Sequence, residues 1–144
     1  MKRRDNMQTA AGKLCVALYE ELGDVVLPAM ARVYGQYGYE IGRGLAERWK
    51  PRDLAEAARA FIALCNDQGL PSSVVMKGDV GHWTGHKCPF GLENTRREVC
   101  DALMAMDREL FRGLLDLSPG RLALTIEKTL AAGDDCCQGI FHLL

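Results

Sequence analysis

The chain has 144 residues, of which 48% are apolar and 26% are charged. This composition excludes a disordered chain, and the length fits a single domain over residues 1–144. Eighteen Lys and Arg residues against nineteen Asp and Glu residues leave a net charge of −1, so the basic field of a nucleic-acid-binding protein is missing. No apolar run is long enough to span a membrane, and the basic N-terminus leads into no signal-like apolar segment. We therefore expect a cytoplasmic protein without nucleic-acid or membrane partners.

The first half, residues 1–70, is predicted to be helical. Apolar residues recur every three or four positions over residues 9–49, which is the period of an amphipathic helix. Pro28 is expected to kink or split this segment. Glycine is costly inside a helix, so the glycines after it suggest close approach of another element or of a ligand. They are Gly35, Gly38, Gly42 and Gly44. A second helix is predicted from residue 52 or 53 and ends before Gly69 and Pro71.

The second half, residues 71–144, reads as hairpin, helix and two further strands. Strands are expected at residues 72–77 and 80–87 around a Gly-Asp turn, and at residues 121–129 and 137–143. A helix is expected over residues 93–117. The predicted fold class is α+β: an antiparallel sheet of about four strands with N-terminal helices and one central helix packed on it.

Six cysteines are more than a reduced domain of this size needs, and in the cytoplasm clustered thiols are more often metal-binding or catalytic than crosslinked. Cys15 and Cys65 lie on apolar helix stripes and are expected in the core. Strand alternation over residues 80–87 would place His86 and Cys88 on one face, within reach of one metal ion or ligand. The alternative is an exposed histidine beside a small buried cysteine.

Asp107 stands among apolar neighbours on the predicted central helix, on one stripe with Cys100. A carboxylate turned toward a core must be paired, hydrogen-bonded or protonated, so this residue is either a structural partner or a functional acid or base. Cys136 and Cys137 are adjacent in the last strand and are expected to point to opposite faces, although a vicinal disulfide would give a thiol-dependent redox protein. The chain contains no CxxC pair, so cysteine spacing alone is a weak metal motif.

Four segments together resemble the L-2-amino-thiazoline-4-carboxylic acid hydrolase family. They are LTIEKTLAAGDDCC at residues 124–137, CPF at residues 88–90, the Cys100 to Asp107 helix, and, more loosely, YGQYGYEIGRGL at residues 34–45. The resemblance covers mainly residues 74–143. Matching positions are Cys88, Cys100, Asp107, Thr129, Gly133, Asp134 and Cys137. Met104 departs from the family pattern, where relatives often carry a second helical cysteine.

The resemblance implies opening of a small cyclic substrate by attack of water or of a thiolate. The predicted catalytic residues are Cys100, Asp107 and Cys137. The residues predicted to bind the substrate or ligand are Trp83, His86, Arg96 and Glu127. Alternatively, Cys88, Cys100 and Cys137 with a fourth ligand would hold a zinc ion that activates water.

A more distant likeness is to V4R (4-vinyl reductase) domains, which bind small molecules and in some regulators hold zinc. This resemblance implies a different function class, a non-catalytic sensor or binding domain with a structural zinc. In either case the expected partner is a small molecule. The glycine-rich helix and small core also favour a homodimer.

Overall fold

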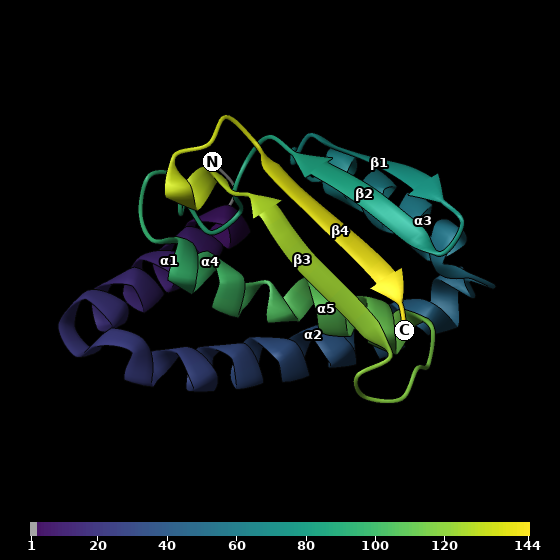
Figure 1. Cartoon of the computed structure of the whole chain (residues 1–144), viewed down its shortest axis with the longest axis horizontal. Coiled ribbons are helices and arrows are strands. Elements are labelled where there is room, and N and C mark those ends of the chain that lie inside the picture. Colours follow the sequence, from purple (N-terminus) through teal and green to yellow (C-terminus); the bar gives the residue numbers. More distant parts are fainter. Residues whose placement is uncertain (1–2) are drawn as a thin grey trace.

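A computed structural model describes residues 3–144, with side chains from Met7 onward. In chain order the elements are α1 (Arg3–Leu22), η1 (Gly23–Val26), α2 (Leu27–Trp49), α3 (Leu54–Asp67), β1 (Ser72–Lys77), β2 (Val80–Gly85), α4 (Arg97–Leu103), α5 (Ala105–Leu114), β3 (Leu122–Lys128), η2 (Leu130–Ala132) and β4 (Cys137–Leu143). The helices lie on one side of an antiparallel sheet (Figure 1). The predicted α+β fold class is confirmed.

The sheet has the strand order β1-β2-β4-β3, so the last strand lies inside the sheet. The predicted Gly-Asp turn joins β1 to β2, and Gly78 adopts a positive φ of 63° there. β2 then pairs with β4 in a register that places Trp83 opposite Gly139 and Gly81 opposite Phe141. β3 pairs with β4 along the other side, with an irregularity between Ile126 and Lys128.

The first predicted helix is divided, but not at the predicted residue. Gly23, at a φ of 74°, ends α1, and a short 3-10 turn leads into α2. Pro28 lies in the first turn of α2, where its missing N–H costs no helical hydrogen bond. The two helices diverge from this turn (Figure 1).

The glycines of α2 allow it to pack against α5 at backbone distance. A Cβ atom on Gly38 would lie 2.1 Å from the carbonyl oxygen of Met106, and one on Gly42 would lie 2.1 Å from that of Leu110. Gly113 of α5 faces the carbonyl of Tyr39 in the same way, at 2.5 Å. The predicted close approach at these glycines is confirmed, and the approaching element is a helix. Gly44 differs, because a Cβ there would meet nothing within 4 Å.

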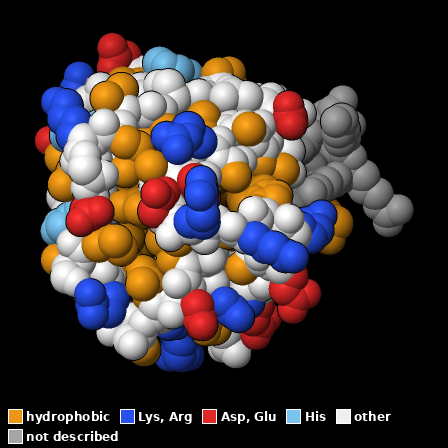
Figure 2. All heavy atoms as spheres, turned by 90° about the vertical axis from the view of Figure 1, so that its right-hand side faces the viewer, with side chains coloured by type: hydrophobic (Ala, Val, Ile, Leu, Met, Phe, Trp, Pro, Cys, Tyr) orange, Lys and Arg blue, Asp and Glu red, His pale blue; other side chains and the backbone are white. Residues whose placement is uncertain are grey.

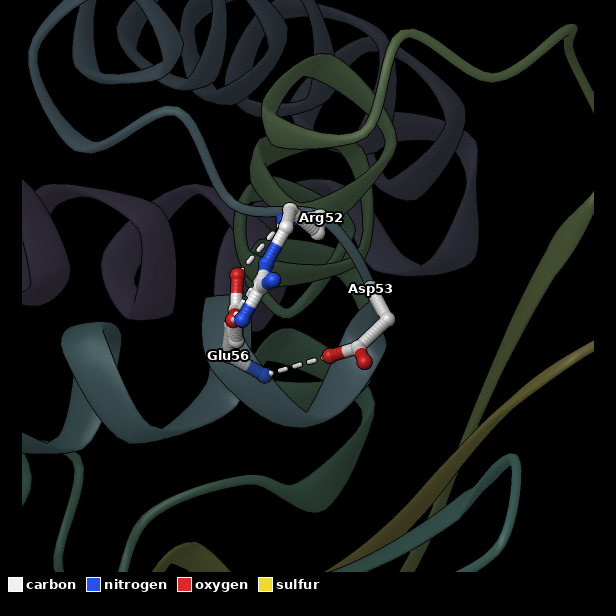
Figure 3. Close-up of polar contacts among 3 residues, drawn as sticks. All are labelled: Arg52, Asp53 and Glu56. Carbon is white, nitrogen blue, oxygen red and sulfur yellow. Dashed lines mark hydrogen bonds and ion pairs between the residues drawn. The ribbon is translucent and has the colours of Figure 1, made fainter.

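A capping arrangement fixes the start of α3 (Figure 3). Asp53 accepts a hydrogen bond of 2.9 Å from the backbone N–H of Glu56. Glu56 in turn accepts 2.6 and 2.9 Å bonds from the Arg52 guanidinium and a 2.7 Å bond from its backbone N–H. Backbone donors that the first helical turn leaves free are thus partnered by side chains.

The predicted central helix of residues 93–117 is two helices. α4 ends at Leu103 and α5 begins at Ala105, with the break at Met104. The break interrupts the predicted stripe of Cys100 and Asp107, and the two residues lie on different helices. Cys100 on α4 faces Thr129, at the start of η2, whereas α5 packs against α2 and against β3 of the sheet.

The core has two centres. One surrounds α4 and the loop before it and contains Cys15, Met30, Phe90, Leu92, Val99, Cys100, Ala102, Leu103 and Ala131. The other lies between α5, α3 and the sheet and contains Leu45, Leu54, Ala57, Ala58, Leu110, Phe111, Leu114, Leu122 and Phe141. Phe111 stacks on Phe141 with ring centres 4.9 Å apart and meets Phe61 edge-on at 5.2 Å. These aromatic contacts join α5, β4 and α3.

Side chains form hydrogen bonds with backbone groups on both edge strands, β1 and β3. On β1, Asn66 donates a 3.0 Å bond to the carbonyl of Ser72 and accepts a 3.0 Å bond from its N–H. On β3, Arg97 donates a 2.5 Å bond to the carbonyl of Ile126.

None of the described helices is long and apolar enough to cross a membrane. Figure 2 views the end of the molecule where the C-terminus lies and shows hydrophobic side chains interspersed with charged ones.

Candidate functional site

Glycines on the helix-facing side of β2 and β4 make room for two large aromatic rings. The rings of Phe141 and Trp83 lie where Cβ atoms of these glycines would stand: Phe141 at Gly81, and Trp83 at Gly85. Trp83 also lies 3.3 Å from a Cβ position on Gly139 of β4. The indole therefore lies flat across two glycines, between the sheet and the helices.

The indole nitrogen of Trp83 is the unusual atom of this region. Trp83 is half-buried, but its Nε1 atom is buried and has no hydrogen-bond partner among the described residues. A buried donor without a partner loses its water hydrogen bond without replacement, at a cost of roughly 1–3 kcal/mol. Such atoms are rare in folded proteins and call for a specific explanation.

Asp107 is a second polar group without a partner in the same layer. It is partly buried on α5, and no described residue donates a hydrogen bond to it or pairs with its charge. Burial raises the pKa of its carboxyl to about 6. Its charge acts on Cys65 of α3, whose pKa is raised to about 12 by burial and, to a smaller extent, by Asp107.

Two sets of contacts place Asp107 and Trp83 in the same part of the layer between the helices and the sheet. Asp107 lies one helical turn before Phe111, which stacks on Phe141, and Trp83 covers Gly139, two residues before Phe141. α5 and β4 run in the same direction (Figure 1). The charge of Asp107 reaches Cys65 of α3, and α3 packs on β1, where Ser72 pairs with the Gly85 that Trp83 covers. Trp83, Asp107, Cys65 and Ser72 thus form one region, which we call the inner-face site.

Three of the predicted thiols, those of Cys88, Cys100 and Cys137, lie around η2. Buried Thr129 donates a 3.2 Å bond to Cys100 Sγ and accepts a 3.1 Å bond from the N–H of Ala131. Cys137 Sγ accepts a 3.4 Å bond from the N–H of Leu130. Cys88 Sγ accepts a bond of the same length from the N–H of Leu92.

Two thiols of this group, those of Cys88 and Cys100, are held in the neutral form. Burial raises the pKa of Cys100 to about 11, against a lowering effect of the Thr129 hydrogen bond. Burial also raises the pKa of Cys88. Cys100 lies close enough to Cys137 and Cys88 that a thiolate at either position would raise the pKa of Cys100.

The structure separates the other predicted residues from these two regions. β2 ends at Gly85, so the prediction that His86 and Cys88 share a strand face is wrong, and His86 is exposed. Glu127 is exposed on β3. Arg96 is exposed and donates bonds of 2.8 and 3.1 Å to Glu20 of α1. Of the predicted binding residues, Trp83 alone faces the inner-face site.

No metal-binding set is assembled in the part of the chain with described side chains: no three His, Cys, Asp or Glu residues there are placed to hold one ion. All six cysteines are free thiols, so no disulfide joins Cys136 to Cys137. The role of the three thiols around η2 stays a prediction.

The site also contains residues that sequence patterns did not single out. Cys65 was assigned to the core and Ser72 to a strand, because nothing local connects α3 or β1 to Asp107. Glycine alternates with aromatic residues in β2 and β4, over Gly81 to Gly85 and Gly139 to Phe141. This pattern in the sequence indicates where large rings pack on the sheet.

Two grooves open on the outer surface. One, of about 310 Å³, lies between α4, α5 and β3, and the other, of about 400 Å³, lies between α2 and α5. They share Arg108, and neither is lined by a residue predicted to be functional.

Comparisons with known proteins support the fold. No family model matches the chain and no curated protein sequence is similar, so neither supports the hydrolase resemblance. Among solved structures, subunit 3 of a trafficking protein particle complex from Naegleria fowleri, covalently bound to palmitic acid, has a TM-score of 0.67 at 14% identity over 98% of this chain and 95% of that one. The phenol-responsive sensory domain of the transcription activator PoxR, with phenol, has a TM-score of 0.68 at 13% identity over 94% and 74%. The chain therefore has the fold of these two structures.

Proposed function

We propose that this chain is a non-catalytic small-molecule-binding domain. Its ligand lies at the inner-face site, with an apolar body against the Trp83 ring and a polar group between Trp83 Nε1 and the Asp107 carboxyl. The observation that carries the proposal is the buried, unpartnered Nε1 atom in the same layer as a carboxyl that also lacks a partner among the described residues.

The two groups define a ligand chemistry. An indole N–H donates only, and a carboxylate accepts only. A hydroxyl group can accept from the first and donate to the second, so it satisfies both at once. The surrounding aromatic and aliphatic side chains favour a small apolar or aromatic body. A small aromatic alcohol meets both requirements.

The structures of similar fold support a ligand of this kind. One carries phenol and is a sensory domain, and the other carries palmitic acid. Both ligands combine an apolar body with a single oxygen-bearing end.

The hydrolase hypothesis has no comparable support. A thiol nucleophile acts as a thiolate, whereas burial keeps the pKa of Cys100 at about 11 and raises that of Cys88. Turnover of L-2-amino-thiazoline-4-carboxylate that is lost in both Cys137→Ala and Asp107→Asn would revive this prediction.

Zinc binding by Cys88, Cys100 and Cys137 is a separate hypothesis. Three thiols are the ligands that structural zinc prefers, but they need a fourth partner and must lose their protons. Metal analysis of the purified protein decides the matter. Near one zinc per chain, lost in Cys100→Ser, supports the site, and a folded metal-free protein contradicts it.

Binding of phenol and of methylphenols, followed by calorimetry and thermal unfolding, tests the proposed function. We expect phenol to raise the melting temperature, because a ligand that binds only the folded state stabilises it. Toluene, which matches 4-methylphenol without the hydroxyl, is expected to bind at least about tenfold more weakly, since it leaves both polar groups unsatisfied.

Two tryptophans provide a matched pair of variants. Trp83→Phe keeps an aromatic ring but removes the donor, and we expect it to weaken phenol binding by about tenfold or more. Trp49→Phe, at the end of α2, is expected to keep wild-type affinity. Circular dichroism confirms that both variants are folded. No binding by any hydroxylated aromatic, or equal binding by Trp83→Phe and wild type, would overturn the proposal.

A further inference from the structure

One face of α1 packs on the rest of the molecule. Gly12 meets the backbone of Phe90 so closely that a Cβ would lie 2.1 Å from its carbonyl oxygen. Cys15 is buried, and Val16 and Tyr19 pack against the same core. This face, together with the ion pair between Glu20 and Arg96, attaches α1 to the rest of the molecule.

The opposite face of α1 exposes a second set of apolar residues. Met7, Leu14 and Leu22 are 69%, 60% and 58% exposed, and Leu18 is 37% exposed. Spacings of seven and four residues place these side chains on one stripe, which Val25 of η1, 76% exposed, continues. We call these five residues the α1 stripe. A helix with apolar residues on two faces is typical of a helix buried on two sides.

The size of the α1 stripe fits an interface. The exposed fractions of its five residues correspond to an apolar patch on the order of 500 Å², which is large for a monomer surface. A standard protein interface buries about 800 Å² on each partner, with an apolar centre and a polar rim. The stripe therefore supplies the centre of such an interface.

The distribution of charge along this segment favours a second, antiparallel copy of α1 as the partner. In the sequence, residues 2–13 include four basic residues and one acidic one, whereas residues 14–26 include three acidic residues and no basic one; Glu20 is already paired with Arg96, which leaves Glu21 and Asp24 for a partner. A second copy of α1 in antiparallel orientation would set each basic end against an acidic end. A parallel copy would oppose like charges, which is unfavourable.

We propose that two copies of this chain associate through antiparallel packing of their α1 stripes. A two-fold axis near Leu14 places Met7 of each copy opposite Leu22 of the other and Ala11 opposite Leu18. The contact is self-complementary and closed, as expected for a symmetric dimer. It leaves the inner-face site unobstructed, so it does not depend on the proposed function.

Sedimentation velocity over a wide range of concentration tests the association. We expect a concentration-dependent dimer for the wild type, and Leu14→Glu to raise its dissociation constant by more than about hundredfold, because a charge would enter the apolar centre. Val75→Glu is the matched control: Val75 is 58% exposed on β1, away from the stripe, and its variant should dimerise as the wild type does. Thermal unfolding checks that both variants fold.

Crosslinking tests the orientation. A mixture of the Met7→Cys and Leu22→Cys proteins should form more disulfide-linked dimer than either protein alone or the wild type. A monomeric wild type at all concentrations, an unaffected Leu14→Glu dimer, or preferential crosslinking of Met7→Cys with itself would overturn the proposal.

Discussion

At the scale of single residues, Asp107 illustrates how a fold can hold a carboxyl without satisfying it. The carboxyl has a pKa near 6 because burial removes water without supplying a donor. The free carboxyl of an unfolded chain titrates near 3.8. Between these values the folded state keeps a proton that the unfolded state releases, so the free energy of unfolding falls as pH rises.

Asp107→Asn removes this charge, and its effect on stability should depend on pH. Near pH 8 we expect the variant to be more stable than wild type by about 2 kcal/mol, and near pH 4 we expect little difference. Urea unfolding at the two pH values measures this. Glu47→Gln, at an exposed position of α2, should show no such pH dependence. Equal effects of Asp107→Asn at both pH values would show that the carboxyl is not desolvated.

At the scale of elements, the contact between α2 and α5 depends on glycine at defined positions. Gly38 and Gly42, four residues apart, face α5, whereas Gly44 faces open space. The sequence shows that the segment is rich in glycine. It does not show which glycines are needed, since that depends on the neighbour.

Two substitutions in one helix separate these roles. Gly38→Ala should lower the free energy of unfolding by more than about 2 kcal/mol, because its Cβ would press on the Met106 carbonyl and force the helices apart. Gly44→Ala should raise it by about 0.5–1 kcal/mol, since alanine is the better helix former where space is free. Chemical denaturation measures both. A Gly38→Ala protein as stable as wild type would show that the two helices can separate at little cost.

At the scale of the whole molecule, α1 is the element with the least support. It contacts the loop before α4 through one face and diverges from α2 (Figure 1). In contrast, α5 lies between α2 and the sheet. Local stability follows such packing, so α1 should open more readily than α5.

Hydrogen exchange can detect this difference. Amides of α1 should exchange faster than those of α5 in dilute protein, and their protection should rise with concentration as the proposed dimer forms. The Leu14→Glu variant serves as the control, because its α1 protection should not respond to concentration. Protection of α1 equal to that of α5 in dilute protein would contradict this view of the molecule.

Local patterns were sufficient for most of the fold. Period and turn residues predicted α3, the hairpin around Gly78, and β4. They failed at Gly23 and Met104, where the structure interrupts helices that were predicted to continue. The candidate site was less predictable. Asp107 stood out by its apolar neighbours, but its proximity to Trp83 arises from pairings between segments far apart in sequence.

The side chains on the two edge strands limit how this molecule can assemble. An exposed sheet edge is a template for another strand, and proteins that leave it open are prone to aggregate. Asn66 occupies both backbone groups of Ser72 on β1, and Arg97 occupies the Ile126 carbonyl on β3 beside a local irregularity. An incoming strand would have to displace these bonds before it could pair. Edge-to-edge pairing is thereby hindered at one position on each edge strand, Ser72 on β1 and Ile126 on β3.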